Sequence, residues 1–174
     1  SSTGVVTFKT PPNYEAPSDV GANNVYNITV TAADGTLQST AQAVAITVTN
    51  TNEAPTMTSG ASASFAENAT GTVYTATASD VDAGTSLSYV LGGVDAALFN
   101  IDSSTGVVTF KTPPNYESPS DAGANNVYNI TVTASDGALQ STSQAVAITV
   151  TNTNEAPIVT SGATASFAEN ATGT

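Results

Sequence analysis

The chain has 174 residues, which allows one large or two small domains, and 40% of them are hydrophobic, enough to fill a core. Lysine and arginine total 2 against 14 aspartates and glutamates, so the formal net charge is −12, which argues against nucleic acid as a partner because phosphates require clustered cations. The absence of histidine and cysteine excludes Ser-His-Asp and Cys-His nucleophiles, the usual nitrogen and sulfur zinc sites, and disulfides.

Membrane insertion is not expected, because no apolar stretch approaches the roughly 20 residues that span a bilayer. The first residues also lack the basic and then apolar pattern of a signal peptide. We therefore expect a soluble chain, with any export signal outside this sequence.

From its first residue onward, the chain repeats itself with a period of 102 residues. Residues 1–72 align on 103–174 without a gap and differ at eight positions, all of them exchanges between small or apolar residues. A period of this length is typical of a whole small domain in tandem rather than of a solenoid turn. Three units are predicted: the C-terminal part of one repeat with its linker at 1–55, a complete repeat with its linker at 56–157, and the first strand of a third repeat at 158–174.

Strand signals dominate the complete repeat, and no helical stretch is expected. Valine, threonine, isoleucine and aromatic residues alternate with small polar residues, and Gly, Asp-Gly and Pro-Pro turn signals separate these runs. Seven strands are expected near 61–66, 72–79, 86–91, 97–101, 105–112, 126–134 and 139–151. Seven short strands in one repeat predict an all-β fold, in which seven-stranded Greek-key sandwiches of immunoglobulin-like type are joined end to end.

The core is expected on the residues that share one face of each strand. The candidates are Val73, Leu87, Tyr89, Leu98, Phe99, Ile101, Val108, Phe110, Tyr128, Ile130, Val132, Val146, Ile148 and Val150. Tyr14 and Tyr116 lie in a proline-rich loop instead. Most aromatic side chains are therefore interpreted as core residues and not as a ligand platform.

Most acidic residues fall where strands end. If consecutive strands alternate in direction, the connections after odd strands share one pole of the domain and those after even strands share the other. In an end-to-end array, the two kinds of pole face each other across each junction. The first junction is then expected to hold Glu15, Asn50, Asn52, Glu53, Asp80, Asp82 and Asp136, and the second Glu67, Glu117, Asn152, Asn154 and Glu155.

A cation is expected at these junctions, because carboxylates packed together repel one another. Oxygen donors without histidine or cysteine favour Ca²⁺ or Mg²⁺, and Ca²⁺ better tolerates the loose geometry of carboxylates and amides from separate loops. The alternative is that the acids are solvated charges that keep the protein soluble. Asp121, in the long loop before residue 126, either binds an ion or caps a turn.

The motifs together resemble cadherin repeats, and most closely the bacterial cadherin-like domains of large secreted or cell-surface adhesins. The matching segments are FAEN at 65–68, SDVDAG at 79–84, FNIDSSTGVVTF from Phe99, PPNYE at 113–117, VTASDG from Val132, and VTNTNEAP from Val48 and again from Val150. In that family, the matching residues bind several Ca²⁺ ions between successive domains and stiffen the array. Asn50 and Asn152 stand where the family has a linker aspartate, and Asn13 and Asn115 replace another, so fewer or weaker ions are expected.

The resemblance implies a structural role outside the cell: a calcium-rigidified extender in a long adhesin or surface filament that mediates cell adhesion, biofilm or matrix attachment. Its partners would be neighbouring repeats of the same chain, with homophilic or lateral self-association left open. The alternative is a homophilic or carbohydrate-binding module of a secreted polysaccharide-associated protein. An enzyme is not expected, since the carboxylates are placed at poles and not paired in a cleft.

Overall fold

The complete repeat folds as two layers of strands that enclose one core. The computed structural model describes residues 3–170 and 172. One layer contains β4 (Ser62–Ala66), β11 (Gln144–Thr151), β10 (Val127–Ser135) and β7 (Ser88–Gly92), in that order. The other contains β5 (Thr72–Thr75), β9 (Val107–Phe110) and β8 (Phe99–Ile101), with β3 (Thr56–Met57) paired to β6 (Ala78–Ser79). The all-β sandwich prediction is confirmed.

The pairing of the strands confirms that consecutive strands alternate in direction. β11 pairs in parallel with β4, as the first and last of seven alternating strands must. β10 pairs antiparallel with both β11 and β7, and β9 pairs antiparallel with both β5 and β8. Each loop therefore lies at the pole that alternation assigned to it.

The seven predicted strands are present with local differences. The segment predicted at 72–79 is divided into β5 and β6, with a register shift between Thr72 and Tyr74. Ala96–Leu98 form a short 3₁₀ helix (η1) before β8, so the expectation of no helical stretch is wrong for these residues. The last strand begins at Gln144 rather than at 139, and the two-residue strand β3 was not predicted.

The core largely contains the residues predicted for it, and Val108, Tyr128, Val132 and Ile148 are completely buried. Four predicted members are only partly buried against it: Leu87, Leu98, Ile101 and Phe110. The prediction missed Tyr74, Ala76 and Ala134. Tyr74 can be buried because its hydroxyl donates to the carbonyl of Gly60 at 2.6 Å, which satisfies its polar end.

Residues 3–49 contain one hairpin, in which β1 (Val25–Val30) pairs antiparallel with β2 (Gln42–Thr47). The sequence of β9 recurs at Val5–Phe8 but forms no strand there. Its neighbours in the complete repeat, β5 and β8, have no counterparts in residues 3–49. Val6 is consequently 56% exposed, whereas its counterpart Val108 is 0% exposed.

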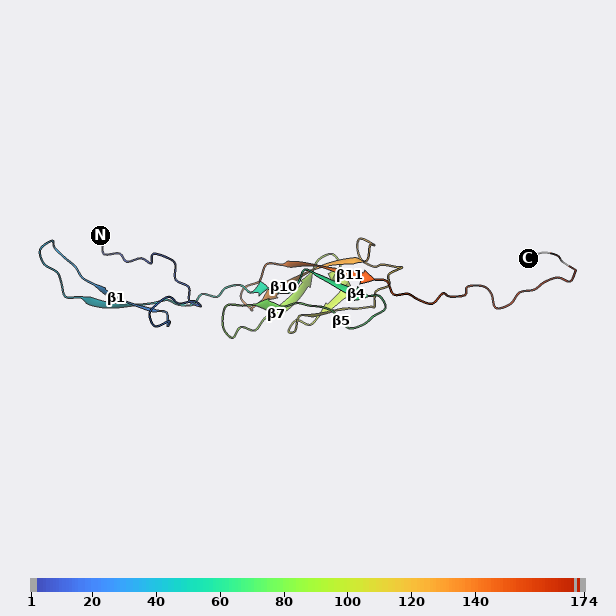
Figure 1. The fold of residues 1–174 in the computed structure, drawn as a ribbon, viewed down its shortest axis with the longest axis horizontal. Coiled ribbons are helices and arrows are strands. Elements are labelled where there is room, and N and C mark those ends of the chain that lie inside the picture. The colour runs from blue at the N-terminus through green and yellow to red at the C-terminus, as the bar shows by residue number, and fades with distance from the viewer. Residues whose placement is uncertain (1–2, 171, 173–174) are drawn as a thin grey trace.

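The hairpin, the complete sandwich and the C-terminal segment follow one another along the long axis of the molecule (Figure 1). Among residues 158–170 and 172, the structure assigns no strand. The domain limits 1–55, 56–157 and 158–174 remain a prediction, and residues 1, 2, 171, 173 and 174 lie outside the described part.

Candidate metal-binding junctions

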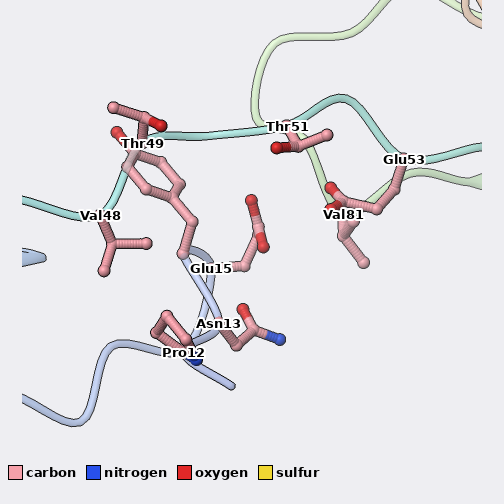
Figure 2. A pocket seen from close by; sticks show the side chains of 9 residues that line it. Pro12, Asn13, Glu15, Val48, Thr49, Thr51, Glu53 and Val81 are labelled. Carbon is pink, nitrogen blue, oxygen red and sulfur yellow. The ribbon is translucent and has the colours of Figure 1, made fainter. Parts of the chain in front are cut away.

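Carboxylates from two successive repeats meet at the first junction. Carboxylate oxygens of Glu15, Glu53 and Asp82 lie within 4.8 Å of one another. Glu15 comes from the upstream repeat, Glu53 from the linker, and Asp82 from the loop after β6. Figure 2 shows Glu15 pointing into a pocket between the upstream loop and the linker, with Glu53 and Val81 on its far side. The pocket measures about 350 Å³.

The linker asparagines bind the aspartates of the complete repeat. The amide of Asn50 donates to Asp82 at 2.6 Å, and that of Asn52 donates to Asp136 at 2.6 Å. The backbone N–H of Glu53 also donates to Asp82, at 3.0 Å. The structure therefore brings together these residues predicted for the first junction: Glu15, Asn50, Asn52, Glu53, Asp82 and Asp136.

One carboxylate oxygen of Asp80 has no hydrogen-bond donor in the described part of the chain. One carboxylate oxygen accepts the backbone N–H of Asp82 at 2.9 Å. The other, Oδ2, is buried and has no hydrogen-bond partner among the described residues. A buried unpaired carboxylate oxygen is costly unless a cation or another donor satisfies it.

The charge at this junction is unbalanced. Desolvation, followed by repulsion from Glu15, Asp82 and Asp80, raises the pKa of Glu53 above its ordinary value. The donor set consists of carboxylates and amides, with no nitrogen or sulfur ligand. An oxygen-liking divalent cation such as Ca²⁺ fits both the unpaired oxygen and the donor chemistry.

The second junction carries a matching cluster, in which carboxylate oxygens of Glu67, Glu117 and Glu155 lie within 4.8 Å of one another. Glu67 is only 2% exposed and accepts backbone N–H groups from Thr153 and Tyr116, each at 2.8 Å. These bonds, with that from Thr153 as the larger cause, lower the pKa of Glu67 below its ordinary value.

Amides also hold the exposed acids of this second cluster. Asn152 donates to Glu117 at 2.8 Å, and Asn68 donates to Glu155 at 2.6 Å. Asn68 was not among the predicted site residues, although it belongs to the FAEN segment. Asn154 is exposed, whereas its counterpart Asn52 donates to Asp136 of the following repeat.

The two acidic clusters contain equivalent residues of successive repeats. A shift of 102 residues places Glu15 on Glu117 and Glu53 on Glu155. The first junction includes the aspartates of the downstream repeat, and the second includes the buried glutamate of the upstream repeat. A junction between two whole repeats would combine both sets.

Asp95 and Asp121 hold loops in place. Asp121 accepts the backbone N–H groups of Asn125 and Asn126 at 3.0 and 2.9 Å, so it caps a turn. Asp95, which is 3% exposed, accepts the backbone N–H groups of Ala122 and Asn129 at 2.8 and 2.6 Å. No role was predicted for Asp95 from the sequence, because its hydrogen-bond partners are 27 and 34 residues away.

A model of the cadherin domain family matches residues 61–151, which is more than half of the chain. The chain belongs to the cadherin domain family. No curated protein matches it. Domains of this family are extracellular adhesion modules without catalytic activity, so the expectation that the chain is no enzyme is confirmed. Within the described residues, no helix has the length and hydrophobicity needed to cross a membrane.

Solved cadherin structures share this architecture. Mouse cadherin-23 EC22–24 is 25% identical, with a TM-score of 0.56 over 79% of this chain and 45% of that chain. Mouse clustered PcdhgC3 EC1–3 is 26% identical, with a TM-score of 0.53 over 78% of this chain and 46% of that chain. The chain thus spans less than half the length of these multi-domain structures.

Proposed function

We propose that this chain is a calcium-stiffened spacer from a long extracellular adhesin or surface filament of bacterial type, which extends an adhesive tip away from the cell. One observation carries the proposal: carboxylates of Glu15, Glu53 and Asp82, from two successive repeats and their linker, lie within 4.8 Å of one another, and Asp80 nearby has a buried oxygen without a partner among the described residues. The near identity of the copies supports a role in building length, since identical units extend an array without adding a new binding surface.

Ca²⁺ would bind between the repeats and not within one of them. At the first junction, Glu15, Glu53, Asp80 and Asp82 would hold the ion, and at the second Glu67, Glu117 and Glu155 would contribute. A bound ion neutralises carboxylates that otherwise repel and ties the upstream loop and linker to the downstream domain. The orientation between neighbouring repeats would then be fixed, which is what a stiff spacer requires.

Thermal unfolding in chelator, in Ca²⁺ and in Mg²⁺ at equal ionic strength tests this proposal. A ligand in hundredfold excess over its Kd stabilises the folded state by about 2.7 kcal/mol, which corresponds to a rise in Tm of roughly ten degrees for a domain of this size. We expect that rise in Ca²⁺ only, and its loss in the double substitution Asp80→Ala and Asp82→Ala.

Glu169→Gln provides the control, because Glu169 is exposed in the C-terminal segment and should leave the Ca²⁺ effect unchanged. Small-angle scattering of a chain with two whole repeats should show a longer maximum dimension in Ca²⁺ than in chelator. Identical melting curves and identical scattering in all three conditions would refute the calcium spacer.

A further inference from the structure

The complete repeat has a cavity between the short 3₁₀ helix η1 and the proline-rich loop that follows β9; we call it the Lys111 hollow. It measures about 420 Å³. Ala97 and Leu98 of η1 line one side, and residues 112–115 line the other. All of its lining residues lie between Ala97 and Ser120, inside the complete repeat. Its volume is in the range of cavities that hold small ligands.

A lysine supplies the charge of this hollow. Lysines and arginines number 2 in the whole chain, and Lys111 is the one that lies in the complete repeat. Its ammonium group donates to the carbonyl of Ala97 at 2.8 Å, which holds it at the hollow and leaves its other N–H donors for a further partner. Among the described residues that line the hollow, none carries a carboxylate. A carboxylate of a ligand would form a strong, charge-assisted hydrogen bond with this ammonium group.

The rest of the lining has the chemistry of a sugar site. Leu98 and Phe110 are only partly buried, so they offer apolar surface to the hollow. Thr112 and Ser118 are exposed and offer hydroxyl groups at its rim. Apolar surface with a few convergent polar groups is the usual lining of a small-ligand site. A pyranose ring has an apolar C–H face and a rim of hydroxyl groups, so it matches both parts of this lining.

Both sides of the hollow are held by backbone hydrogen bonds. On the loop side, the carbonyl of Pro114 accepts the backbone N–H of Asn68 at 2.9 Å. On the helix side, the carbonyl of Leu98 accepts the backbone N–H of Lys111 at 2.9 Å. The hollow is therefore formed before a ligand binds. A preformed site loses less conformational entropy on binding than one that the ligand must order.

We propose that the Lys111 hollow binds a uronate, a sugar residue that carries a carboxylate, and so gives the repeat a site for acidic saccharides. The ammonium group of Lys111 binds the carboxylate, the hydroxyl groups of Thr112 and Ser118 bind those of the ring, and Leu98 and Phe110 pack against its C–H face. This binding function goes beyond the calcium spacer and uses none of the junction acids. One such site has few charged contacts, so we expect a Kd in the millimolar range, which sites in successive repeats would strengthen through avidity.

NMR titration of the isotope-labelled chain, in buffer freed of calcium by a chelating resin, tests this site. The probes are galacturonate and glucuronate, with galactose, glucose and acetate as controls at equal ionic strength. We expect the uronates to shift the backbone amide signals of residues 110–112 and Ser118. The neutral sugars and acetate should bind at least about tenfold more weakly, because the sugars lack the carboxylate and acetate lacks the ring.

Two matched variants separate the site from the net charge of the chain. Lys111→Met removes the ammonium group from an exposed position and should weaken uronate binding roughly tenfold to a hundredfold, while unchanged amide signals of β10 verify its fold. Lys9→Met makes the same change in the same KTPPN sequence, but no η1 lies beside Lys9 in the described residues 3–49, so the shifts around Lys111 should persist.

Three results would each overturn the proposal. They are the absence of shifts at about 20 mM uronate, equal binding of a neutral sugar or of acetate, and equal effects of Lys111→Met and Lys9→Met on uronate binding. Because every arm is free of calcium, failure of this site is separate from failure of the calcium spacer.

Discussion

Glu67→Gln removes one of the two backbone acceptors that Glu67 supplies at the junction, without changing the size of the side chain. Glu67 is 2% exposed, and each of its oxygens accepts one backbone N–H at 2.8 Å. Glutamine keeps one acceptor and turns an NH₂ group toward the other donor. One partly buried N–H is then left without its acceptor, which costs roughly 1–3 kcal/mol. For a domain of 60–100 residues, this lowers Tm by roughly 5–20 °C.

The chain offers a matched control for this substitution. Glu169→Gln changes the same residue in the same FAEN sequence, but Glu169 is exposed in the described structure. Calorimetry in chelator isolates the effect of the hydrogen bonds from any effect of calcium. We expect a clear loss in Tm for Glu67→Gln and none for Glu169→Gln. Equal Tm values for both variants and the parent chain would refute the role given to Glu67.

Further predictions concern packing, loop anchoring and pH. By chemical denaturation, Val108→Ala should cost roughly 1–3 kcal/mol and Val6→Ala almost nothing, although the two share one local sequence; equal losses would contradict the packing account. Asp95→Ala should speed hydrogen exchange at Ala122 and Asn129, because both backbone N–H groups lose their acceptor; unchanged exchange would exclude this anchor. Backbone N–H groups of the turn, with that of Leu37 as the largest cause, lower the pKa of Asp34 to about 2. The ionised carboxylate therefore stabilises the folded chain above pH 3.8, and this contribution is lost as the pH falls through about 2. Carboxyl NMR titration measures this directly, and a midpoint at 3.8 would contradict it.

The strands could be predicted because alternation at period 2 selects large residues for one face, and most of these are buried. Alternation gives less weight to small residues, so Ala76 and Ala134 were missed although they are nearly or fully buried. The 3₁₀ turn at Ala96–Leu98 was also missed. Its position depends on Asp95, which is hydrogen-bonded to Asn129 of strand β10. A local sequence pattern does not reveal a contact with a residue so far along the chain.

The identical segments at 3–10 and 105–112 show how far a local sequence determines structure. The edge-to-face contact of Phe8 with Tyr26 matches that of Phe110 with Tyr128. It forms in the partial repeat because both of its residues lie there. The strand forms only where β5 and β8 supply partners. Sequence periodicity therefore predicted where a strand could form, and the neighbouring strands decided whether it did.

Alternating strand direction was enough to predict which acids share a pole, because that inference needs only the order of the strands. It could not predict the hydrogen bonds among them, which depend on loop conformation. The structure places amide N–H groups against the acids: Asn50 on Asp82, Asn52 on Asp136, Asn68 on Glu155 and Asn152 on Glu117.

These amides explain how an acidic junction keeps its form before any ion binds. A carboxylate at position 50, as in the cadherin linker motif, would face Asp82 as a like charge, whereas the amide of Asn50 donates to it at 2.6 Å. The exchange lowers the negative charge available to a cation, so it weakens binding. The amide of Asn50 also gives Asp82 a hydrogen-bond donor, which a carboxylate at position 50 could not supply. On the proposed function, an array built from such junctions would keep its domains in register at low calcium, and the remaining carboxylates would bind the ion.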